Sequence, residues 1–136
     1  MAQVLDSSVL ITLERRDLTL DDLVKVGAEA PFAIASLSAS ELLVGVHLAD
    51  SKERRARRES FVETVLSSLP VLPFDLRSAR AHASIWSQLT SSGTPISRDD
   101  LFIAAAALSH GYGVLTDNVR DFERVPGLVV RRPNWG

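Results

Sequence analysis

The 136-residue sequence contains no cysteine, and its only lysines are Lys25 and Lys52. The lack of thiols excludes disulfides, thiolate zinc sites and a cysteine nucleophile, so any metal must bind to oxygen or to histidine nitrogen. No run reaches the roughly 18 apolar residues that suggest a membrane span, and residues 1–8 lack the basic and apolar segments of a signal peptide. These absences predict a cytoplasmic protein that is neither exported nor inserted into a membrane.

A large charge of one sign is also lacking, since 15 basic residues oppose 17 acidic ones and leave a net charge of −2. The chain as a whole therefore lacks the basic excess of a typical nucleic-acid-binding protein, and contacts with a polyanion must depend on local clusters. With 46% hydrophobic and 24% charged residues, the composition is that of a globular protein. The length predicts a single domain over residues 1–136.

Short apolar segments alternate with helical patterns along the chain. The segments expected to form strands cover residues 2–5, 32–35, 71–74, 114–116 and 128–131. Strands that alternate with helices are typical of a parallel sheet with helices on both faces. We therefore predict an α/β protein, with a three-layer α/β/α domain and a central, mostly parallel sheet of about five strands.

Two of the expected helix starts have the spacing of a capping box, in which a serine and an acid three residues later bond to each other's backbone. These pairs are Ser38 with Glu41 and Ser97 with Asp100. A capping role and a functional role therefore both stay open for each acid. A further helix is expected over 21–30, where Pro31 stops it, and the helix over 98–108 is apolar nearly all round, which predicts burial on more than one side.

Acidic residues stand where ligands bind in open parallel sheets, outside the carboxyl ends of the strands. Asp6 follows the first strand, Glu41 lies early in the helix after the second, Asp100 opens the helix before the fourth, and Asp117 follows the fourth. We expect these four carboxylates to converge on one rim of the sheet. Asp6 is the hardest to explain as a helix cap, because the serines that follow it are able to cap instead.

Converging carboxylates need a positive partner. Two like charges about 4 Å apart repel by roughly 1 kcal/mol in water and by about 4 kcal/mol at an effective dielectric near 20. No histidine cluster is present, and ligation by oxygen alone suits Mg²⁺ or Mn²⁺ better than zinc or copper. Such ions bind phosphate oxygens and activate water, so the acids point to hydrolysis of a phosphodiester bond.

Three segments resemble the PIN-domain family, and within it the VapC-type toxins of toxin-antitoxin pairs. They are VLDSSVLI at 4–11, SLSASELLVGV at 36–46 and ISRDDLFIAAAALSHGYGVLTDNVRDFERVPGLVV at 96–130. The resemblance implies a PIN-like fold and an Mg²⁺- or Mn²⁺-dependent endoribonuclease, homodimeric and inhibited by a cognate VapB-type antitoxin. It also implies tRNA or rRNA as the substrate. Asp6, Glu41 and Asp100 fall on the acidic positions of the family.

The fourth acidic position stays open. The family places an acid or an asparagine two residues after the threonine of the fourth strand, and here that residue is Asn118. We expect Asp117 or Asp121 to supply charge near a second metal, with Asn118 and Thr116 as hydrogen-bonding support. The predicted catalytic residues are Asp6, Glu41, Asp100 and Asp117, and the predicted metal ligands are these four with Asp121.

Two other functions are weighed against this one. A phosphoacceptor receiver domain also has an acidic rim, but it needs a lysine after a late strand, where this sequence has none. A non-catalytic PIN-like module that binds RNA or protein stays open, because Asn118 is a weaker metal ligand than a carboxylate. The basic run over 52–58 is either a solvated helix start or a docking surface for RNA phosphates or an antitoxin's acidic tail.

Single residues outside the acids carry further expectations. Trp86 lies on the apolar side of its predicted helix and is expected in the core. The arginines nearest to the acidic rim in the sequence are expected either to contact RNA or to substitute for the charge of a metal, namely Arg15, Arg16, Arg98 and Arg120.

Overall fold

The computed structural model describes residues 1–29 and 31–135, which form one parallel sheet with helices on both faces. The described strands are β1 (Gln3–Leu5), β2 (Phe32–Ala35), β3 (Val71–Leu72), β4 (Gly113–Leu115) and β5 (Val130–Arg131). Their order is β3-β2-β1-β4-β5, and all four neighbouring pairs are parallel. The prediction of a five-stranded parallel sheet is confirmed. β3 is shorter than expected, because Pro73 has no N–H to continue the ladder.

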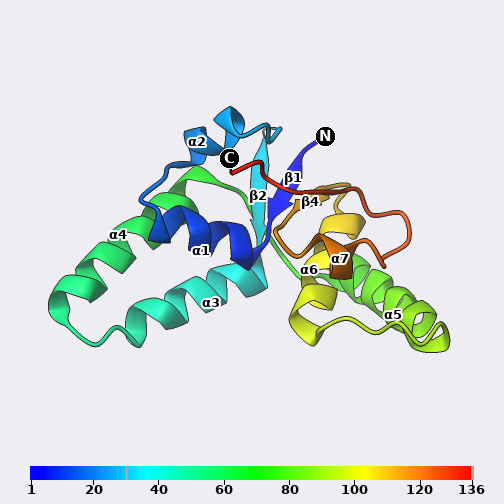
Figure 1. Ribbon diagram of the computed structural model, residues 1–136. Coiled ribbons are helices and arrows are strands. Elements are labelled where there is room, and N and C mark those ends of the chain that lie inside the picture. The colour runs from blue at the N-terminus through cyan, green and yellow to red at the C-terminus, as the bar shows by residue number, and fades with distance from the viewer. Residues whose placement is uncertain (30, 136) are drawn as a thin grey trace.

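The helices form the two outer layers. Figure 1 shows α1 (Ser7–Arg15), α2 (Leu20–Lys25), α3 (Ser36–His47) and α4 (Lys52–Ser68) on one side of the sheet. On the other side lie α5 (Leu76–Ser91), α6 (Arg98–Ser109) and the single-turn α7 (Val119–Phe122). The three-layer α/β/α arrangement is therefore confirmed. Across the described residues, no helix is long and apolar enough to cross a membrane.

Each face of the sheet has its own hydrophobic core, because successive strand side chains point to opposite faces. Val4 belongs to the core under α5 and α6, whereas its neighbour Leu5 belongs to the core under α1 to α4. Central strand β1 is completely buried between β2 and β4. The residue that follows it is therefore held at the middle of the sheet's edge.

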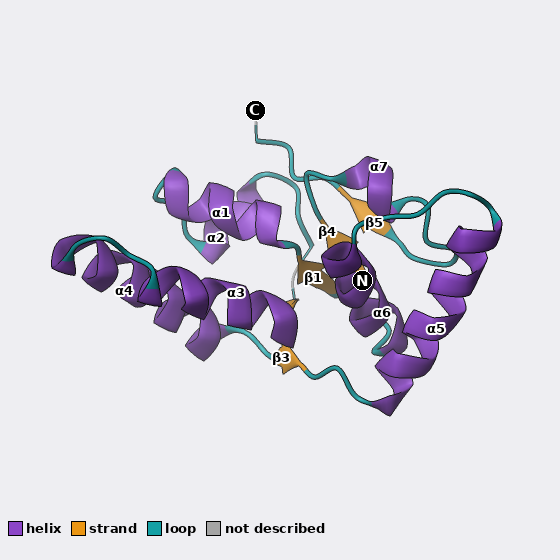
Figure 2. Ribbon diagram, turned by 90° about the horizontal axis from the view of Figure 1, so that it is seen from below, coloured by secondary structure: helices purple, strands orange, loops and turns teal. Residues whose placement is uncertain are grey.

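Helix α6 is buried on several sides, as its sequence predicts. Leu101 and the whole run Ile103–Ala107 are buried, and the helix contacts β1, β2, β4 and α5. Figure 2 shows it between the sheet and α5. Alanine side chains let the helix lie close to the strands, and this fixes the position of its N-terminal acids.

The two predicted capping boxes have different outcomes. At α6, Ser97 is the N-cap and its Oγ accepts a hydrogen bond from the Asp100 backbone N–H at 3.2 Å. At α3, the helix already begins at Ser36, directly after β2, so Ser38 lies inside the helix and the predicted box with Glu41 is wrong. Within the described chain, the buried Ser38 Oγ has no hydrogen-bond partner.

Two further expectations are wrong. Helix α2 ends at Lys25, because Gly27 takes a left-handed φ of 86° well before Pro31 is reached; Ala30, the end of the predicted helix, lies outside the described residues. Trp86 is 57% exposed. Ile85 and Leu89 are the buried side chains of α5 that pack into the hydrophobic core. Trp86 follows Ile85 directly, so its side chain points about 100° away from that of Ile85 around the helix.

Candidate active site

The acids gather where the parallel strands end. In Figure 1 the strands run downward, and α1 and α3 begin just below the ends of β1 and β2. Asp6 directly follows β1, Glu41 lies in the second turn of α3, and Asp100 lies in the first turn of α6. Asn118 and Asp121 come from the segment between β4 and α7 and from α7 itself. Four separate parts of the chain therefore contribute to one edge of the sheet.

Asp6 is buried and its carboxylate is held in a fixed orientation. The Thr116 hydroxyl donates to its Oδ2 at 2.8 Å, and the Ser8 hydroxyl donates to the same oxygen at 2.9 Å. Asp6 precedes α1 as its N-cap but makes no side-chain capping bond there. The inference that capping does not explain this acid is confirmed.

Asp100 shares an amide with Asp121. The Asn118 Nδ2 donates to Asp100 Oδ2 at 2.9 Å and to Asp121 Oδ2 at 3.1 Å. The Asn118 backbone N–H donates to Thr116 Oγ1 at 2.8 Å, so the same threonine bonds both this residue and Asp6. Asn118 therefore bridges two carboxylates and is tied to a third.

Negative charge is only partly compensated at this edge. Burial, together with the charges of Asp6 and Asp121, raises the pKa of Asp100 to about 6, although the hydrogen bonds from Ser97 and Asn118 oppose the rise. An acid with a pKa this high holds a proton more readily than a solvated aspartate, because its charged form is disfavoured. The edge therefore favours the arrival of positive charge.

Glu41 belongs to the same group of charges. Burial raises the pKa of its carboxyl, the Ser7 hydroxyl opposes this by donating to Oε2 at 3.2 Å, and the charges of Asp99 and Asp6 raise it further. Because Glu41 is not used in a capping box, its carboxylate is available to the site.

Asp117 is placed differently from the other predicted acids. Its Oδ1 accepts a hydrogen bond from the Trp135 indole N–H at 3.0 Å, and its backbone N–H donates to Ser8 Oγ at 3.1 Å. It is not among the charges that raise the pKa of Asp100 or Glu41, whereas Asp121 acts on Asp100. The structure thus brings together Asp6, Glu41, Asp100 and Asp121, with Asp117 bonded to the C-terminal segment.

Three residues make contacts at this edge that the sequence did not predict. Ser7 and Ser8 were considered only as helix caps, yet their hydroxyls bond Glu41 and Asp6. The run Asp-Ser-Ser directly after a buried strand is the signal that identifies them. Trp135 had no local signal, because its partner Asp117 is known only from the folded chain.

The donor set fits a hard divalent cation. Burial and neighbouring negative charge raise the pKa values of Asp100 and Glu41, and a cation bound by their carboxylate oxygens would neutralise that charge. In the conformation of the described residues, no three acidic or histidine side chains are close enough to hold one ion. Asp6, Asp100 and Asp121, with Glu41, are the side chains that would hold it.

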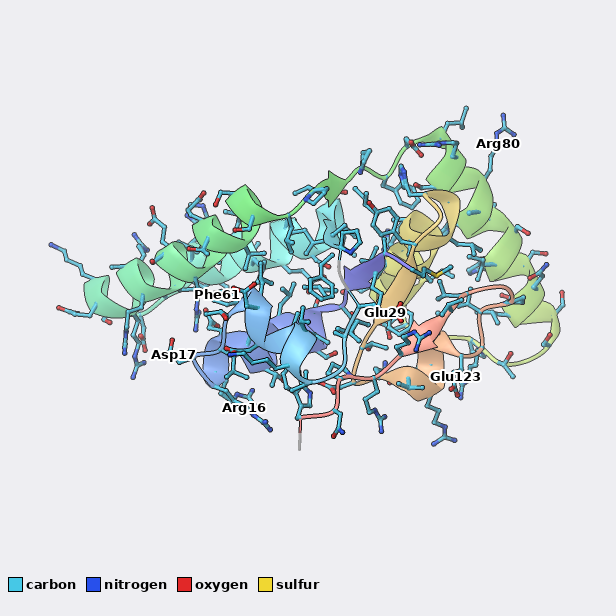
Figure 3. The ribbon with its side chains drawn as sticks, turned by 90° about the horizontal axis from the view of Figure 1, so that it is seen from above. Arg16, Asp17, Glu29, Phe61, Arg80 and Glu123 are labelled. Atoms are coloured by element: carbon cyan, nitrogen blue, oxygen red, sulfur yellow. The ribbon has the colours of Figure 1, made fainter. Side chains whose placement is uncertain are left out.

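Two of the four arginines expected to contact RNA pack against aromatic rings of the protein. The Arg16 guanidinium lies over the Trp135 ring, 5.5 Å from its centroid, and the Arg98 guanidinium lies 5.7 Å from the Phe102 centroid. Figure 3 shows Arg16 on the side of the molecule where the C-terminal segment ends. These stacked planar cations keep their charge and remain candidates for phosphate contact.

The basic run over 52–58 partly supports the turn between α3 and α4. Arg54 donates to both carboxylate oxygens of Asp50, at 2.9 and 2.8 Å, and Arg58 donates to the Gly45 carbonyl at 3.0 Å. The run also borders a groove of about 1620 Å³ between α1, α2, α3 and α4, which Arg54, Arg57 and Arg58 line. These hydrogen bonds support a structural role for residues 52–58. Because three of the arginines also line the groove, a docking role stays open.

Fold and site define the class of this protein. The family model of the PIN domain matches residues 4–128, and the chain belongs to this family. Ribonuclease VapC1 of Rickettsia felis is 34% identical over 130 residues, which cover 96% of this chain and 95% of the relative. The tRNA(fMet)-specific endonuclease VapC of Salmonella typhimurium is 36% identical over 102 residues, 75% of this chain and 74% of the relative.

A solved structure has the same fold over nearly its whole length. The chain superposes on DNA-bound VapBC of Salmonella typhimurium with a TM-score of 0.83 and 28% identity, covering 97% of this chain and 98% of that one. The resemblance to PIN domains of the VapC type, first noted in three sequence segments, is therefore confirmed.

Proposed function

We propose that this protein is an Mg²⁺- or Mn²⁺-dependent endoribonuclease, the VapC-type toxin of a toxin-antitoxin pair, with residues 1–136 forming a single domain. The observation that carries the proposal is the mutual electrostatic effect of acids from separate parts of the chain. Asp6 and Asp121 both raise the pKa of Asp100, and Asp6 raises that of Glu41. Carboxylates that repel one another at the edge of a sheet are suited to bind a divalent cation.

Each acid has a distinct part in the proposed site. Asp6 and Asp100 are the central metal ligands, with Asp6 aligned by the hydroxyls of Thr116 and Ser8. Glu41 and Asp121 add further negative charge, and Asp117 remains a candidate ligand that would first have to leave Trp135. A bound divalent ion supplies an activated water as nucleophile and stabilises the leaving oxygen of the phosphodiester.

Asp100 also sets a proton balance at the site. Its pKa of about 6 means that a fraction of the carboxyl groups is protonated near neutral pH, and a cation must displace that proton. Asn118, which donates to the carboxylate, helps to keep the group ionised and oriented. This chain's own residues thereby hold the ligand oxygens in place before a cation arrives.

RNA is the proposed substrate, in the class of tRNA or rRNA. Support comes from the relatives, which are named ribonucleases and in one case a tRNA(fMet)-specific endonuclease. Arg15, Arg16, Arg98 and Arg120 are the proposed phosphate contacts. In this reading the net charge of −2 is no obstacle, because the contacts depend on individual arginines and not on the charge of the whole chain.

The proposed partner is a VapB-type antitoxin, and the proposed assembly of the toxin is a cytoplasmic homodimer. Solved neighbours of this fold include a VapBC pair. The groove between α1, α2, α3 and α4 is a candidate seat for the antitoxin, and its arginines suit an acidic segment. Figure 3 shows Phe61 of α4 on this side of the molecule, where it contributes an apolar side chain to the groove.

The test compares the purified, antitoxin-free protein with its Asp6→Asn variant on total bacterial RNA. Each is incubated with Mg²⁺, with Mn²⁺ and with EDTA, and the new RNA ends are sequenced. We expect discrete cuts that require both metal and Asp6, and these cuts name the target RNA. Cleavage that survives Asp6→Asn or EDTA would contradict the proposed chemistry.

A non-catalytic PIN-like module that binds RNA or protein is the second candidate. Asn118 favours it, because an amide stands at the fourth position of the site and already satisfies two carboxylates. This candidate predicts RNA or antitoxin binding without cuts under any metal condition. The same incubation therefore distinguishes the two functions.

A further inference from the structure

The C-terminal segment crosses the sheet to reach the opposite layer. Figure 1 shows it running from the β5 side back towards α1 and α2. The Asn134 backbone N–H donates to the Val26 carbonyl at 3.1 Å, beyond the end of α2. Trp135 packs against the core under α1 to α4, and Arg16 covers its ring. The segment is therefore anchored at its far end.

Residues 132–135 also form hydrogen bonds to Asp117, the residue between Thr116 and Asn118. The Arg132 Nη2 donates to the Asp117 carbonyl at 3.0 Å, and the Trp135 indole N–H donates to its Oδ1 at 3.0 Å. Ser8 Oγ accepts from its backbone N–H at 3.1 Å. The backbone donor, the backbone acceptor and the side chain of one residue are thus all bonded, and two of these bonds come from residues 132–135.

The neighbours of Asp117 carry the contacts of the acidic site. Thr116 bonds Asp6 and the Asn118 backbone, and the Asn118 side chain bridges Asp100 and Asp121. Rotation of the backbone at Asp117 would move Asn118 away from both carboxylates. The restraints on Asp117 therefore also restrain the bridge.

We propose that residues 132–135 act as a C-terminal latch, in which Trp135 and Arg132 hold Asp117 so that Asn118 stays between Asp100 and Asp121. The latch rests on the proposed function for its role in catalysis, but not for its structural effect. Trp135 and Arg132 are positioning residues, since they touch Asp117 and not the bridged carboxylates. The Asp117 carboxylate serves as the acceptor of the latch in this arrangement.

Two substitutions weaken the latch with little change in packing. Trp135→Phe removes the indole N–H but keeps an aromatic ring beneath Arg16. Arg132→Gln shortens the side chain that reaches the Asp117 carbonyl. Trp86→Phe is the matched control, because Trp86 is an exposed tryptophan of α5 outside this region. Circular dichroism checks that each variant is folded.

The primary measurement is hydrogen exchange by NMR at the Asp117 and Asn118 backbone amides and at the Asn118 side-chain amide. Loss of one hydrogen bond predicts about five-fold faster exchange in Trp135→Phe and Arg132→Gln, with Trp86→Phe like the wild type. Mn²⁺ affinity measured by calorimetry is expected to fall by about the same factor. If Trp135→Phe does not fold, Arg132→Gln carries the test.

A double-mutant cycle isolates the effect of the hydrogen bond between Trp135 and Asp117. Trp135→Phe combined with Asp117→Ala is expected to loosen Asn118 no more than either single change, because both remove the same bond. Additive effects, or wild-type exchange at the Asn118 side chain in both latch variants, would overturn the latch. The exchange measurement needs neither metal nor RNA, so it tests the latch independently of catalysis. A wild-type protein that cuts no RNA would contradict the proposed function, and the exchange rates would still decide whether the latch exists.

Discussion

The N-terminal turns of α3 and α6 look alike in sequence but are built differently. Each has a serine three residues before an acid, but only Ser97 caps its helix, whereas Ser38 lies inside α3 with its hydroxyl buried. Helix α3 starts directly after β2, while α6 starts after a connecting loop. The distance between strand end and helix start, rather than the serine-acid spacing, decides which hydroxyl meets a free backbone N–H.

Both acids nevertheless reach the same edge of the sheet, by different routes. Asp100 is half-buried, bonded to Asn118 and strongly shifted in pKa, whereas Glu41 is bonded to Ser7 and shifted less. The depth of burial thus separates a central acid from a peripheral one. Changes at the two helices should reveal this difference.

The largest expected effect is on RNA cleavage. Loss of an outer partner of a metal ligand lowers activity by about 10- to 100-fold, so loss of a proposed central ligand in Asp100→Asn should lower kcat at least about 100-fold. Glu41→Gln should lower it about 10-fold, because Glu41 lies at the periphery. Cleavage rates at saturating Mg²⁺ give the ratio. Equal losses would remove the distinction between the two acids.

A second expected effect is on stability in the absence of metal. The folded-state pKa of Asp100, about 6, lies above its ordinary value of 3.8, so the folded protein binds more protons between these values. The contribution of Asp100 to the stability of the metal-free protein should therefore fall as pH rises from about 4 to about 6, by on the order of 1 kcal/mol after allowance for solvent screening.

Asp100→Asn tests this sign directly. The variant lacks the titrating group, so at pH 7 without metal it should be more stable than the wild type by a similar amount. Urea unfolding at pH 4 and pH 7 measures both free energies of unfolding. The prediction fails if Asp100→Asn is less stable than the wild type at pH 7.

The capping difference predicts a smaller effect on stability. Ser97→Ala removes an N-cap and should lower the free energy of unfolding by about 1 kcal/mol. Thermal or urea unfolding is the measurement, and Ser97→Asp, which restores a capping oxygen, is the control. Unchanged stability in Ser97→Ala would show that the cap contributes little.

Ser38→Ala should have the smallest effect. Its buried hydroxyl lacks a partner among the described residues, so removing it gives no lost hydrogen bond and relieves desolvation. Stability should stay within about 0.5 kcal/mol of the wild type or rise. A loss as large as that of Ser97→Ala would imply a hydrogen bond at Ser38 in solution.

The local pattern of the sequence was sufficient to predict the layers of the fold and to select three acids of the candidate site. Alternating apolar segments and helical stripes depend on neighbours a few residues apart, and the β2 range was predicted without error. Asp6 and Asp100 could be identified because acids at strand ends and helix starts are local features. The end of α2 could not be predicted, because the backbone angle of Gly27 depends on the surrounding structure. The exposure of Trp86 could not be predicted either, because it depends on how α5 packs.

The sequence by itself determined a parallel α/β domain with acids at the carboxyl ends of its strands, because periodicity and turn residues act over short distances. Only the tertiary structure decided how those acids are held. Thr116 and Asp6 are separated by 110 positions, and Trp135 and Asp117 by 18, so their bonds exist only after the sheet has brought the segments together. The positions of Asp117 and Asp121 relative to Asp100 also depend on that packing, because Asp117 follows β4 and bonds Trp135, whereas Asp121 lies in α7 and shares the Asn118 amide with Asp100.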